Sequence, residues 1–218
     1  MRKNTVIIGI AGKMRTGKDT IARLMAKDRR GNFQRGAYAD ELKMQVDRKY
    51  GKQEGGKRRA LLQHEGQEER KHDALVWIKR LQPKIDFLRS TGHNVVITDV
   101  RQQNEIDSLR AQGAYIIRVN VSDEIRKQRI IDAGDEFKED DFYHETETAI
   151  DTFEVDYEIN NEGGLIQLVQ QLDAILLSID LREKKKIAMR KVLDEFAKEA
   201  AKTLRTISRK EALRNGRI

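Results

Sequence analysis

The sequence of 218 residues contains no cysteine, one proline and one tryptophan. The absence of cysteine excludes disulfide bonds, thiolate metal sites and a cysteine nucleophile. Long apolar runs are also missing: none approaches the roughly 20 residues that a membrane-spanning helix needs. The apolar stretch after Met1-Arg2-Lys3 soon meets Lys13, Arg15 and Lys18, which argues against a signal peptide. We therefore expect a soluble, cytoplasmic protein that makes no contact with a membrane.

The formal net charge of +7 is concentrated at one end of the chain. Residues 181–218 hold 13 Lys and Arg residues against five Asp and Glu residues, whereas residues 1–180 hold 30 against 31. The larger part is thus nearly neutral, and its charge gives no reason to expect that it binds nucleic acid.

A glycine-bounded loop follows the first apolar run and precedes an amphipathic helical pattern. The order is an apolar strand near residues 5–10, then Gly12, four residues, Gly17 and Lys18. This arrangement is typical of a P-loop, whose backbone N–H groups and lysine surround nucleotide phosphates. The helix that begins near Lys18 adds the positive end of its dipole. The residues expected to contact the phosphates are Gly12, Lys13, Arg15, Thr16, Gly17, Lys18, Asp19 and Thr20.

One position departs from the usual P-loop pattern. The residue after the lysine is ordinarily Ser or Thr, whose hydroxyl meets Mg²⁺, but here it is Asp19, followed by Thr20. A carboxylate is also a good Mg²⁺ ligand, directly or through water. We therefore expect Asp19 to take part in a Mg²⁺ site and Thr20 to donate to a phosphate.

Five short apolar runs alternate with helical patterns along the chain. The runs lie near residues 5–10, 34–38, 94–99, 115–120 and 157–160, and the helical patterns near 17–27, 39–50, 72–90, 103–112, 122–132 and 164–179. This alternation predicts an α/β fold of three layers, with a five-stranded parallel sheet and right-handed crossovers. A ligand then lies beyond the carboxyl ends of the strands. Pro83 is expected to open or kink a helix.

Five sequence blocks between residues 5 and 178 carry a resemblance to a known family. They are Gly12-Lys13-Met14-Arg15-Thr16-Gly17-Lys18-Asp19-Thr20, Leu61-Leu62-Gln63-His64-Glu65-Gly66 with Trp77-Ile78-Lys79, Ile97-Thr98-Asp99-Val100-Arg101-Gln102-Gln103-Asn104-Glu105, His144-Glu145-Thr146-Glu147, and Asp156-Tyr157-Glu158-Ile159-Asn160-Asn161-Glu162-Gly163-Gly164-Leu165. The chain resembles the phage deoxynucleoside monophosphate kinases, within the P-loop nucleoside-kinase superfamily that includes dephospho-coenzyme A kinases. The resemblance implies ATP and Mg²⁺ as cofactors and a (deoxy)nucleoside 5′-monophosphate as acceptor.

The resemblance also implies a domain organisation. Residues 1–180 form the P-loop kinase domain, with an acceptor-binding arm at 51–73 and a lid region at 122–150, both of which are polar and charged. The alternative is that these two segments are solvated excursions without a role.

The resemblance implies catalytic roles for Lys18, Asp40, Arg101, Arg126 and Arg129, and a metal-binding role for Asp99. Lys18 holds the donor triphosphate, and Arg126 and Arg129 are lid arginines that neutralise the transferred phosphoryl group. Asp99 orients Mg²⁺ or its water, and Arg101 pairs with the acceptor phosphate through its planar fork. The alternatives are a solvated basic face for the two lid arginines, and an ion pair between Asp99 and Arg101 that serves structure alone.

Further candidates surround the acceptor and the base. Asp40 resembles the acidic residue that touches the acceptor, with a helix N-cap as the equal alternative. Asn161 would border the adenine, unless it belongs to an ordinary turn. The other acceptor-binding candidates are Lys43, Arg70 and Trp77, although for Trp77 we favour a place in the core over stacking on a base. A metal site within residues 144–147 is not expected, because three ligands in four residues demand strained geometry.

The C-terminal tail, residues 181–218, carries an amphipathic helical pattern. Its apolar residues form one narrow stripe: Met189, Leu193, Phe196, Ala197, Ala200, Leu204 and Ile207. Its basic residues away from the stripe are Lys191, Lys198, Lys202, Arg205 and Arg209. We favour a helix that packs on its own body or in a homodimer over one that binds a membrane surface or nucleic acid, because acidic residues interrupt the basic face.

Three functions are compatible with the sequence. The first, which we favour, is the Mg²⁺-dependent monophosphate kinase. The second is a kinase that acts on a hydroxyl group, as dephospho-coenzyme A kinases do, for which Asp40 would be the essential base. The third is a nucleotide-binding adaptor that uses its basic tail on nucleic acid or on a partner.

Overall fold

The computed structural model describes residues 5–27, 32–52, 55–134 and 149–214. Five strands form one sheet: β1 (Ile7–Gly12), β2 (Phe33–Gly36), β3 (Asn94–Val100), β4 (Tyr115–Asn120) and β5 (Tyr157–Asn160). Their order is β2-β3-β1-β4-β5, and every neighbouring pair is parallel. The predicted five-stranded parallel sheet is confirmed.

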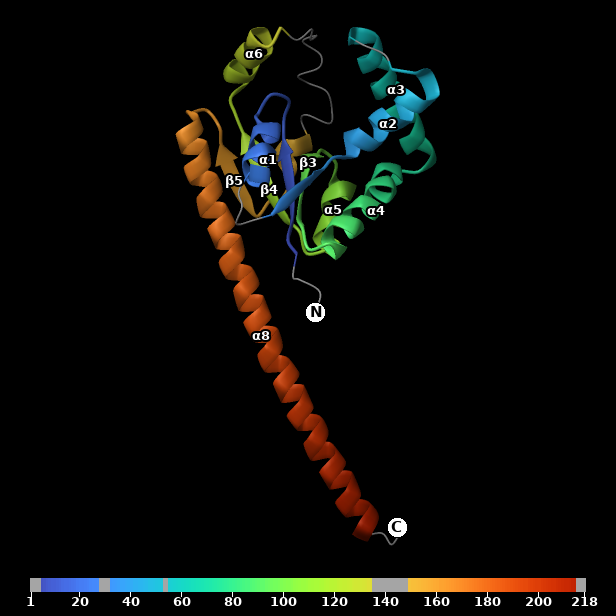
Figure 1. The fold of residues 1–218 in the computed structure, drawn as a ribbon, viewed down its shortest axis with the longest axis vertical. Coiled ribbons are helices and arrows are strands. Elements are labelled where there is room, and N and C mark those ends of the chain that lie inside the picture. Colours follow the sequence, from blue (N-terminus) through green and yellow to red (C-terminus); the bar gives the residue numbers. More distant parts are fainter. Residues whose placement is uncertain (1–4, 28–31, 53–54, 135–148, 215–218) are drawn as a thin grey trace. The chain divides into compact units, whose positions relative to one another are not determined.

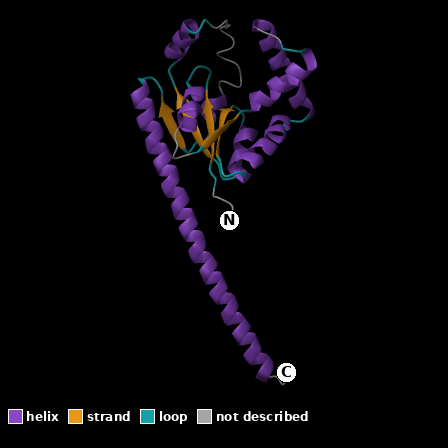
Figure 2. Ribbon diagram, in the orientation of Figure 1, coloured by secondary structure: helices purple, strands orange, loops and turns teal. Residues whose placement is uncertain are grey.

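A helix follows each strand along the chain (Figures 1 and 2). The helices are α1 (Lys18–Lys27), α2 (Tyr38–Tyr50), α3 (Gly55–His72), α4 (Val76–Ser90), α5 (Gln103–Ala111), α6 (Asp123–Asp132), a 3₁₀ turn η2 (Ala149–Thr152) and α8 (Leu165–Arg214). None of the described helices is both long and apolar enough to cross a membrane.

The central strands β1 and β3 are buried because helices cover both faces of the sheet. All six residues of β1 are buried. Successive side chains of a strand point to opposite faces, so one set of residues from β1 and β3 packs on α4 and α5. That core includes Ile7, Ala11, Val95, Ile97, Trp77, Leu81, Ile85, Ile106 and Leu109. Because β1 and β3 are neighbours in register, the loop after β1 and the turn after β3 lie side by side at the carboxyl edge of the sheet.

Helix α3 was not predicted from the sequence. It covers most of the polar segment at 51–73 and contains glycines at positions 55, 56 and 66. Its residues show little helical spacing of apolar side chains, and polar contacts hold it to α2 instead. Arg58 pairs with Asp47 at 2.9 Å, and Glu65 accepts hydrogen bonds from Lys49 at 2.9 and 3.0 Å. The predicted acceptor-binding arm is therefore a helical layer on α2.

Two expectations from the sequence concern α4. Trp77 is 2% exposed in the core, which agrees with the core interpretation that we favour for it over contact with the acceptor. Pro83 lies inside α4 rather than at its start, so the helix continues on both sides of it.

The chain divides into two compact units, Met1–Gln171 and Leu172–Ile218. Helix α8 is 50 residues long and runs through this division and through the boundary expected at residue 180. The pattern at 164–179 and the amphipathic tail are thus parts of one continuous helix. The lid positions between residues 135 and 148, including His144, Glu145 and Glu147, lie outside the described residues.

Candidate active site

The loop between β1 and α1 is held by its own backbone and by the residue that ends it. Lys18 Nζ donates hydrogen bonds to the carbonyl oxygens of Gly12 at 2.5 Å and Lys13 at 2.6 Å. Thr16 is 1% exposed, and its Oγ1 donates to the Lys13 carbonyl at 2.9 Å. The ammonium group of Lys18 is therefore fixed over the loop, at the amino end of α1, where the helix dipole favours an anion.

Gly17 is required by two independent features of the loop. Its φ of +94° is rarely adopted by residues with a side chain, and a Cβ there would lie 2.4 Å from Asn161 Nδ2. Asn161 is buried, and its Nδ2 donates to the Thr16 carbonyl at 2.8 Å. Asn161 thus ties the segment after β5 to the loop, a role that the sequence analysis did not foresee. Gly12, the other glycine that bounds the loop, also has no room for a side chain, because a Cβ there would lie 2.8 Å from Thr16 Oγ1.

Two arginines of α6 also donate hydrogen bonds to the backbone of this loop. Arg126 is 1% exposed; its Nε donates to the Met14 carbonyl at 2.9 Å, and its Nη1 pairs with Asp123 at 2.6 Å. Arg129 donates to the carbonyls of Arg15 at 3.2 Å and Asn161 at 2.7 Å. The alternative of a solvated basic face is therefore wrong for Arg126. In this structure both side chains bind loop carbonyls, and a direct role in phosphoryl transfer stays a prediction.

Asp99 joins β3 to the start of α2. Its Oδ1 accepts from the Tyr38 backbone N–H at 2.9 Å, and its Oδ2 accepts from Ala39 at 2.7 Å. These are orphan donors of the first turn of α2, so Asp99 serves as a cap supplied from another element. The N-cap alternative for Asp40 is wrong, since the N-cap position is Ala37.

Glu105 fixes the turn that presents Arg101. Its Oε2 accepts the backbone N–H groups of Arg101 at 2.8 Å and Gln102 at 3.1 Å. Gln102 and Glu105 form a capping box at the start of α5. Ser, Thr, Asp or Asn usually stands where Gln102 does in a capping box, so the sequence did not mark this role of Glu105.

Charged groups at this edge shift one another's pKa values. Burial raises the pKa of Glu105 to about 7, with the charge of Asp99 adding to the effect and the two backbone donors opposing it. Burial likewise raises the pKa of Asp99. On α3, burial lowers the pKa of Arg70, while the charges of Glu105 and Asp99 raise it and that of Arg101 lowers it. Two arginines and two carboxylates therefore share one partly desolvated region beside the P-loop.

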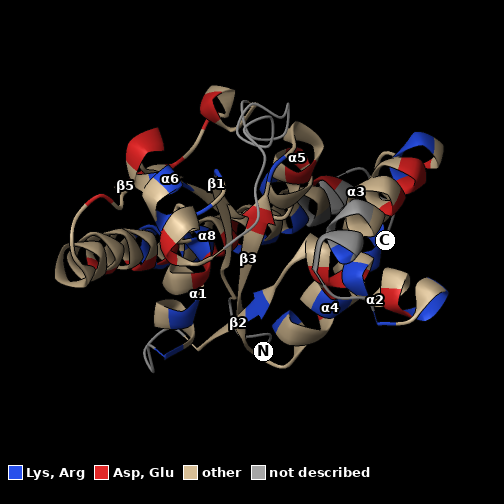
Figure 3. Cartoon of the chain, turned by 90° about the horizontal axis from the view of Figure 1, so that it is seen from above, with Lys and Arg blue, Asp and Glu red and all other residues tan. Residues whose placement is uncertain are grey.

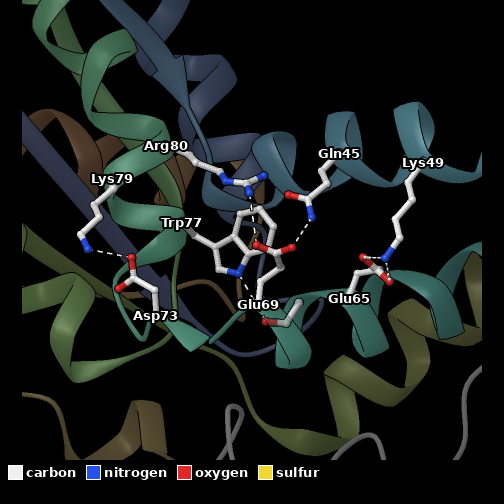
Figure 4. A network of polar contacts seen from close by, with 9 residues as sticks. Gln45, Lys49, Glu65, Glu69, Asp73, Trp77, Lys79 and Arg80 are labelled. Carbon is white, nitrogen blue, oxygen red and sulfur yellow. Dashed lines mark hydrogen bonds and ion pairs between the residues drawn. The ribbon is translucent and has the colours of Figure 1, made fainter. Parts of the chain in front are cut away.

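Arg70 reaches this region from α3, which a polar network fixes on its neighbours (Figure 4). Glu69 accepts from Gln45 of α2 at 2.7 Å and pairs with Arg80 of α4 at 3.2 Å. Arg80 also lies 5.0 Å from the ring centroid of Trp77. Arg70 itself donates to the carbonyl of Gly66 in its own helix at 3.3 Å.

The remaining acidic and basic candidates are more exposed. Asp40 is held by Arg35 at 2.5 Å and lies 4.0 Å from Lys43. Lys13 forms a 2.6 Å ion pair with Asp151 of η2. Over the described helices and strands of the body, both signs of charge are interspersed (Figure 3).

The residues at the amino end of α1 fit a Mg²⁺ ion bound together with phosphates. Asp19 is exposed in the first turn of α1, and Thr20 Oγ1 accepts from Arg23 at 3.2 Å. Among the described residues, no group of three or more His, Cys, Asp or Glu side chains could hold a metal by itself. Mg²⁺ commonly takes one or two carboxylates and completes its shell with water and substrate phosphates, so a single carboxylate is sufficient here.

Comparison with known proteins identifies the family. The profile of the family described as AAA domain matches residues 8–151, which include the P-loop, Asp99, Arg101 and α6. The chain belongs to this family. No curated protein sequence matches it significantly.

Several solved structures share the fold of this chain. A sugar kinase from Janibacter sp. HTCC2649 is 16% identical with a TM-score of 0.54, covering 81% of this chain and 95% of that one. A protein from Thermus thermophilus is 19% identical with a TM-score of 0.56, covering 81% and 98%. A shikimate kinase from Bacteroides thetaiotaomicron is 16% identical with a TM-score of 0.51, covering 80% and 98%. This member of the AAA domain family thus has a P-loop kinase fold, to which a long C-terminal helix is added.

Proposed function

We propose that the protein is a Mg²⁺-dependent kinase that transfers the γ-phosphoryl group of ATP to a (deoxy)nucleoside 5′-monophosphate. The observation that carries this proposal is the pairing of two anion sites on neighbouring strands. The P-loop follows β1, and the turn that presents Arg101 follows β3, with Arg70 in electrostatic contact with it.

The donor side has the parts that a triphosphate needs. Lys18 Nζ is held against the carbonyls of Gly12 and Lys13, at the amino end of α1. Phosphoryl transfer depends mainly on positioning and on neutralising charge, so a rigid loop is favourable. The bonds from Arg126 and Arg129 to loop carbonyls supply that rigidity and keep two cations beside the donor. Mg²⁺, when bound, supplies further charge neutralisation between the phosphates.

The acceptor side favours a phosphate over a hydroxyl group. A hydroxyl acceptor needs a general base, whereas a phosphate acceptor is already anionic. Asp40 is paired with Arg35, and both oxygens of Asp99 accept backbone N–H groups. Both carboxylates are therefore engaged in holding structure, while Arg101 and Arg70 offer planar donors suited to a phosphate.

A hydroxyl acceptor is the second candidate, and Glu105 is the observation in its favour. Its pKa of about 7 is close to the value that a general base requires at neutral pH. Against this, its side chain is 3% exposed and accepts two backbone donors. We therefore place the hydroxyl-directed kinase second.

The test is a panel of acceptors assayed with ATP and Mg²⁺. ADP formation is measured with each nucleoside and deoxynucleoside 5′-monophosphate, with hydroxyl compounds such as shikimate, gluconate and dephospho-coenzyme A, and with double-stranded DNA. We expect one or more monophosphates to stimulate ADP formation at least about tenfold, with a matching diphosphate product. The Lys18→Ala variant should fold normally and lose this activity, because Lys18 is the first residue of α1 and is not part of the buried core.

Other outcomes decide against the proposal in distinct ways. Stimulation by a hydroxyl compound alone would establish the second candidate. Stimulation by DNA alone would support a nucleotide-binding adaptor. Full turnover by a folded Lys18→Ala variant would remove the P-loop from the mechanism.

A further inference from the structure

The distal part of α8 presents an apolar face that nothing covers within the described chain. Every residue from 184 to 208 is exposed. The large apolar members of the stripe are strongly exposed: Met189 62%, Leu193 60%, Phe196 70%, Leu204 64% and Ile207 47%. Helices in proteins take most of their stability from packing such a face, so this stretch is incomplete as a lone helix.

We infer that this stripe is the interface of a homodimer, in which the distal parts of two α8 helices pair antiparallel. This inference concerns only residues 187–207 and is independent of the proposed reaction.

The stripe is complementary to itself when one copy is reversed. Met189 and Ile207, and likewise Phe196 and Ala200, stand at equal distances from residue 198. Reversal therefore places the large Phe196 of one copy against the small Ala200 of the other, and Met189 against Ile207. A parallel pair in register would face Phe196 with Phe196 and Ala200 with Ala200, which produces a clash and a gap where close packing is needed.

The spacing of the stripe suits two nearly straight helices. Met189, Leu193 and Phe196 recur eleven residues later as Ala200, Leu204 and Ile207. An eleven-residue repeat has about 3.67 residues per turn, close to the 3.6 of a straight helix, so the stripe winds little around the axis. The two helices can then stay in contact along the whole stripe.

The net charge of the tail does not oppose this pairing. At 100° per residue, Lys191, Lys198 and Lys202 lie about 140–180° around the helix from Leu193. Paired helices lie about 8–10 Å apart, so these side chains point away from the interface and are separated from their copies by about 20 Å. That separation exceeds the Debye length of about 8 Å at physiological salt.

The area is sufficient for a reversible dimer. Side chains of this size bury on the order of 80 Å² each, so five per copy remove about 800 Å² of apolar surface in the pair. The alanines of the stripe and the atoms that flank it bring the total to about 1,000 Å², the lower limit for a specific interface. We therefore expect a dissociation constant in the micromolar range, about 1–100 μM.

A lipid surface or nucleic acid explains fewer of the observations. Asp194, Glu195 and Glu199 occupy the middle of the helix and would be repelled by an anionic membrane. Nucleic acid would use the basic side and leave the apolar stripe in water. A second copy covers the stripe and leaves the basic side solvated.

The first test measures mass and affinity of the full chain by sedimentation velocity from about 1 to 200 μM at physiological salt. We expect a shift from the 25.2 kDa monomer to a dimer. Phe196→Glu should raise the dissociation constant at least about tenfold. Thr206→Glu is the matched control: it adds the same charge about 140° around the helix from Leu193 and should change the constant less than about twofold.

The second test uses the absence of cysteine from the chain, which makes introduced cysteines unambiguous. Met189→Cys and Ile207→Cys proteins are oxidised separately and as a mixture. In an antiparallel dimer the two positions of one helix lie roughly 27 Å apart, so disulfide dimers should form in the mixture alone.

Each alternative outcome overturns part or all of the inference. A monomer throughout the concentration range refutes the homodimer, as does a larger mass that requires added DNA or vesicles. Rapid self-linking of each single-cysteine protein refutes the antiparallel arrangement. Loss of the kinase reaction alone leaves both tests unaffected.

Discussion

The buried carboxyl of Glu105 should make the stability of the protein depend on pH in a predictable direction. Its pKa is about 7 in the folded protein, against 4.5 for an unperturbed glutamate. Between these values the folded state binds more protons than the unfolded state, so the free energy of unfolding falls as pH rises. The stabilisation is complete below pH 4.5 and is lost as pH passes through about 7.

The magnitude follows from the size of this shift. The pKa of Glu105 rises from 4.5 to about 7 on folding. Between pH 5.5 and pH 8 the free energy of unfolding should therefore fall by about 2 kcal/mol. The side chain is 3% exposed, so solvent screening does not reduce this change in the free energy of unfolding. Glu105→Gln should remove the dependence and keep the cap, because both backbone donors bind the same oxygen, Oε2.

The assay is urea unfolding of wild type and Glu105→Gln at pH 5.5 and pH 8. With a urea m-value of about 2–3 kcal/mol/M, the wild-type midpoint should fall between these pH values by about 0.7–1 M more than the variant midpoint. Glu68→Gln is the control, because the pKa of Glu68 is lowered by Lys71 and it stays ionised across this range.

A different pattern would refute the reasoning. If Glu105→Gln and wild type lose stability in parallel from pH 5.5 to 8, the Glu105 carboxyl is already ionised at the lower pH. The region around Arg101 would then be wetter, and more strongly cationic, than the structure indicates.

Three further substitutions test the geometry of the candidate site. Gly17→Ala should weaken ATP binding at least about tenfold by calorimetry, because its Cβ would lie 2.4 Å from Asn161 Nδ2; unchanged affinity would show that the loop relaxes freely. Arg126→Lys should raise the KM for ATP about tenfold, since a lysine cannot bind Met14 and Asp123 together; an effect on thermal stability alone would make Arg126 purely structural. Arg101→Lys should raise the KM for the acceptor about tenfold while the KM for ATP changes less than twofold; equal changes in both constants would argue that Arg101 only shapes the turn.

The donor half of the candidate site could be predicted from the sequence because its information is local. The P-loop needs a strand, a spaced pair of glycines, a lysine and a helix, all within residues 5–27. The strand-and-helix alternation was equally clear, since buried parallel strands give continuous apolar runs. For these features, spacing along the chain determines the arrangement in space.

Roles that depend on contacts between distant residues were missed. Asp99 was expected near Mg²⁺, yet its two oxygens cap α2, which starts 61 residues earlier. Asn161 binds the Thr16 carbonyl across 145 residues. A polar residue after a strand looks the same in the sequence whether it faces a ligand or the backbone of another element, so no local pattern could have separated these cases.

Helix α3 shows why the acceptor half is harder to predict. It is held on α2 and α4 by ion pairs and amide contacts, as at Glu65 and Glu69, rather than by an apolar stripe. Hydrophobic periodicity therefore does not mark it. Yet α3 carries Arg70. The polar network that holds α3 on α2 and α4 therefore also sets the position of Arg70. Under the proposed function, substitutions at Gln45 or Arg80 should alter acceptor selectivity without changing the affinity for ATP.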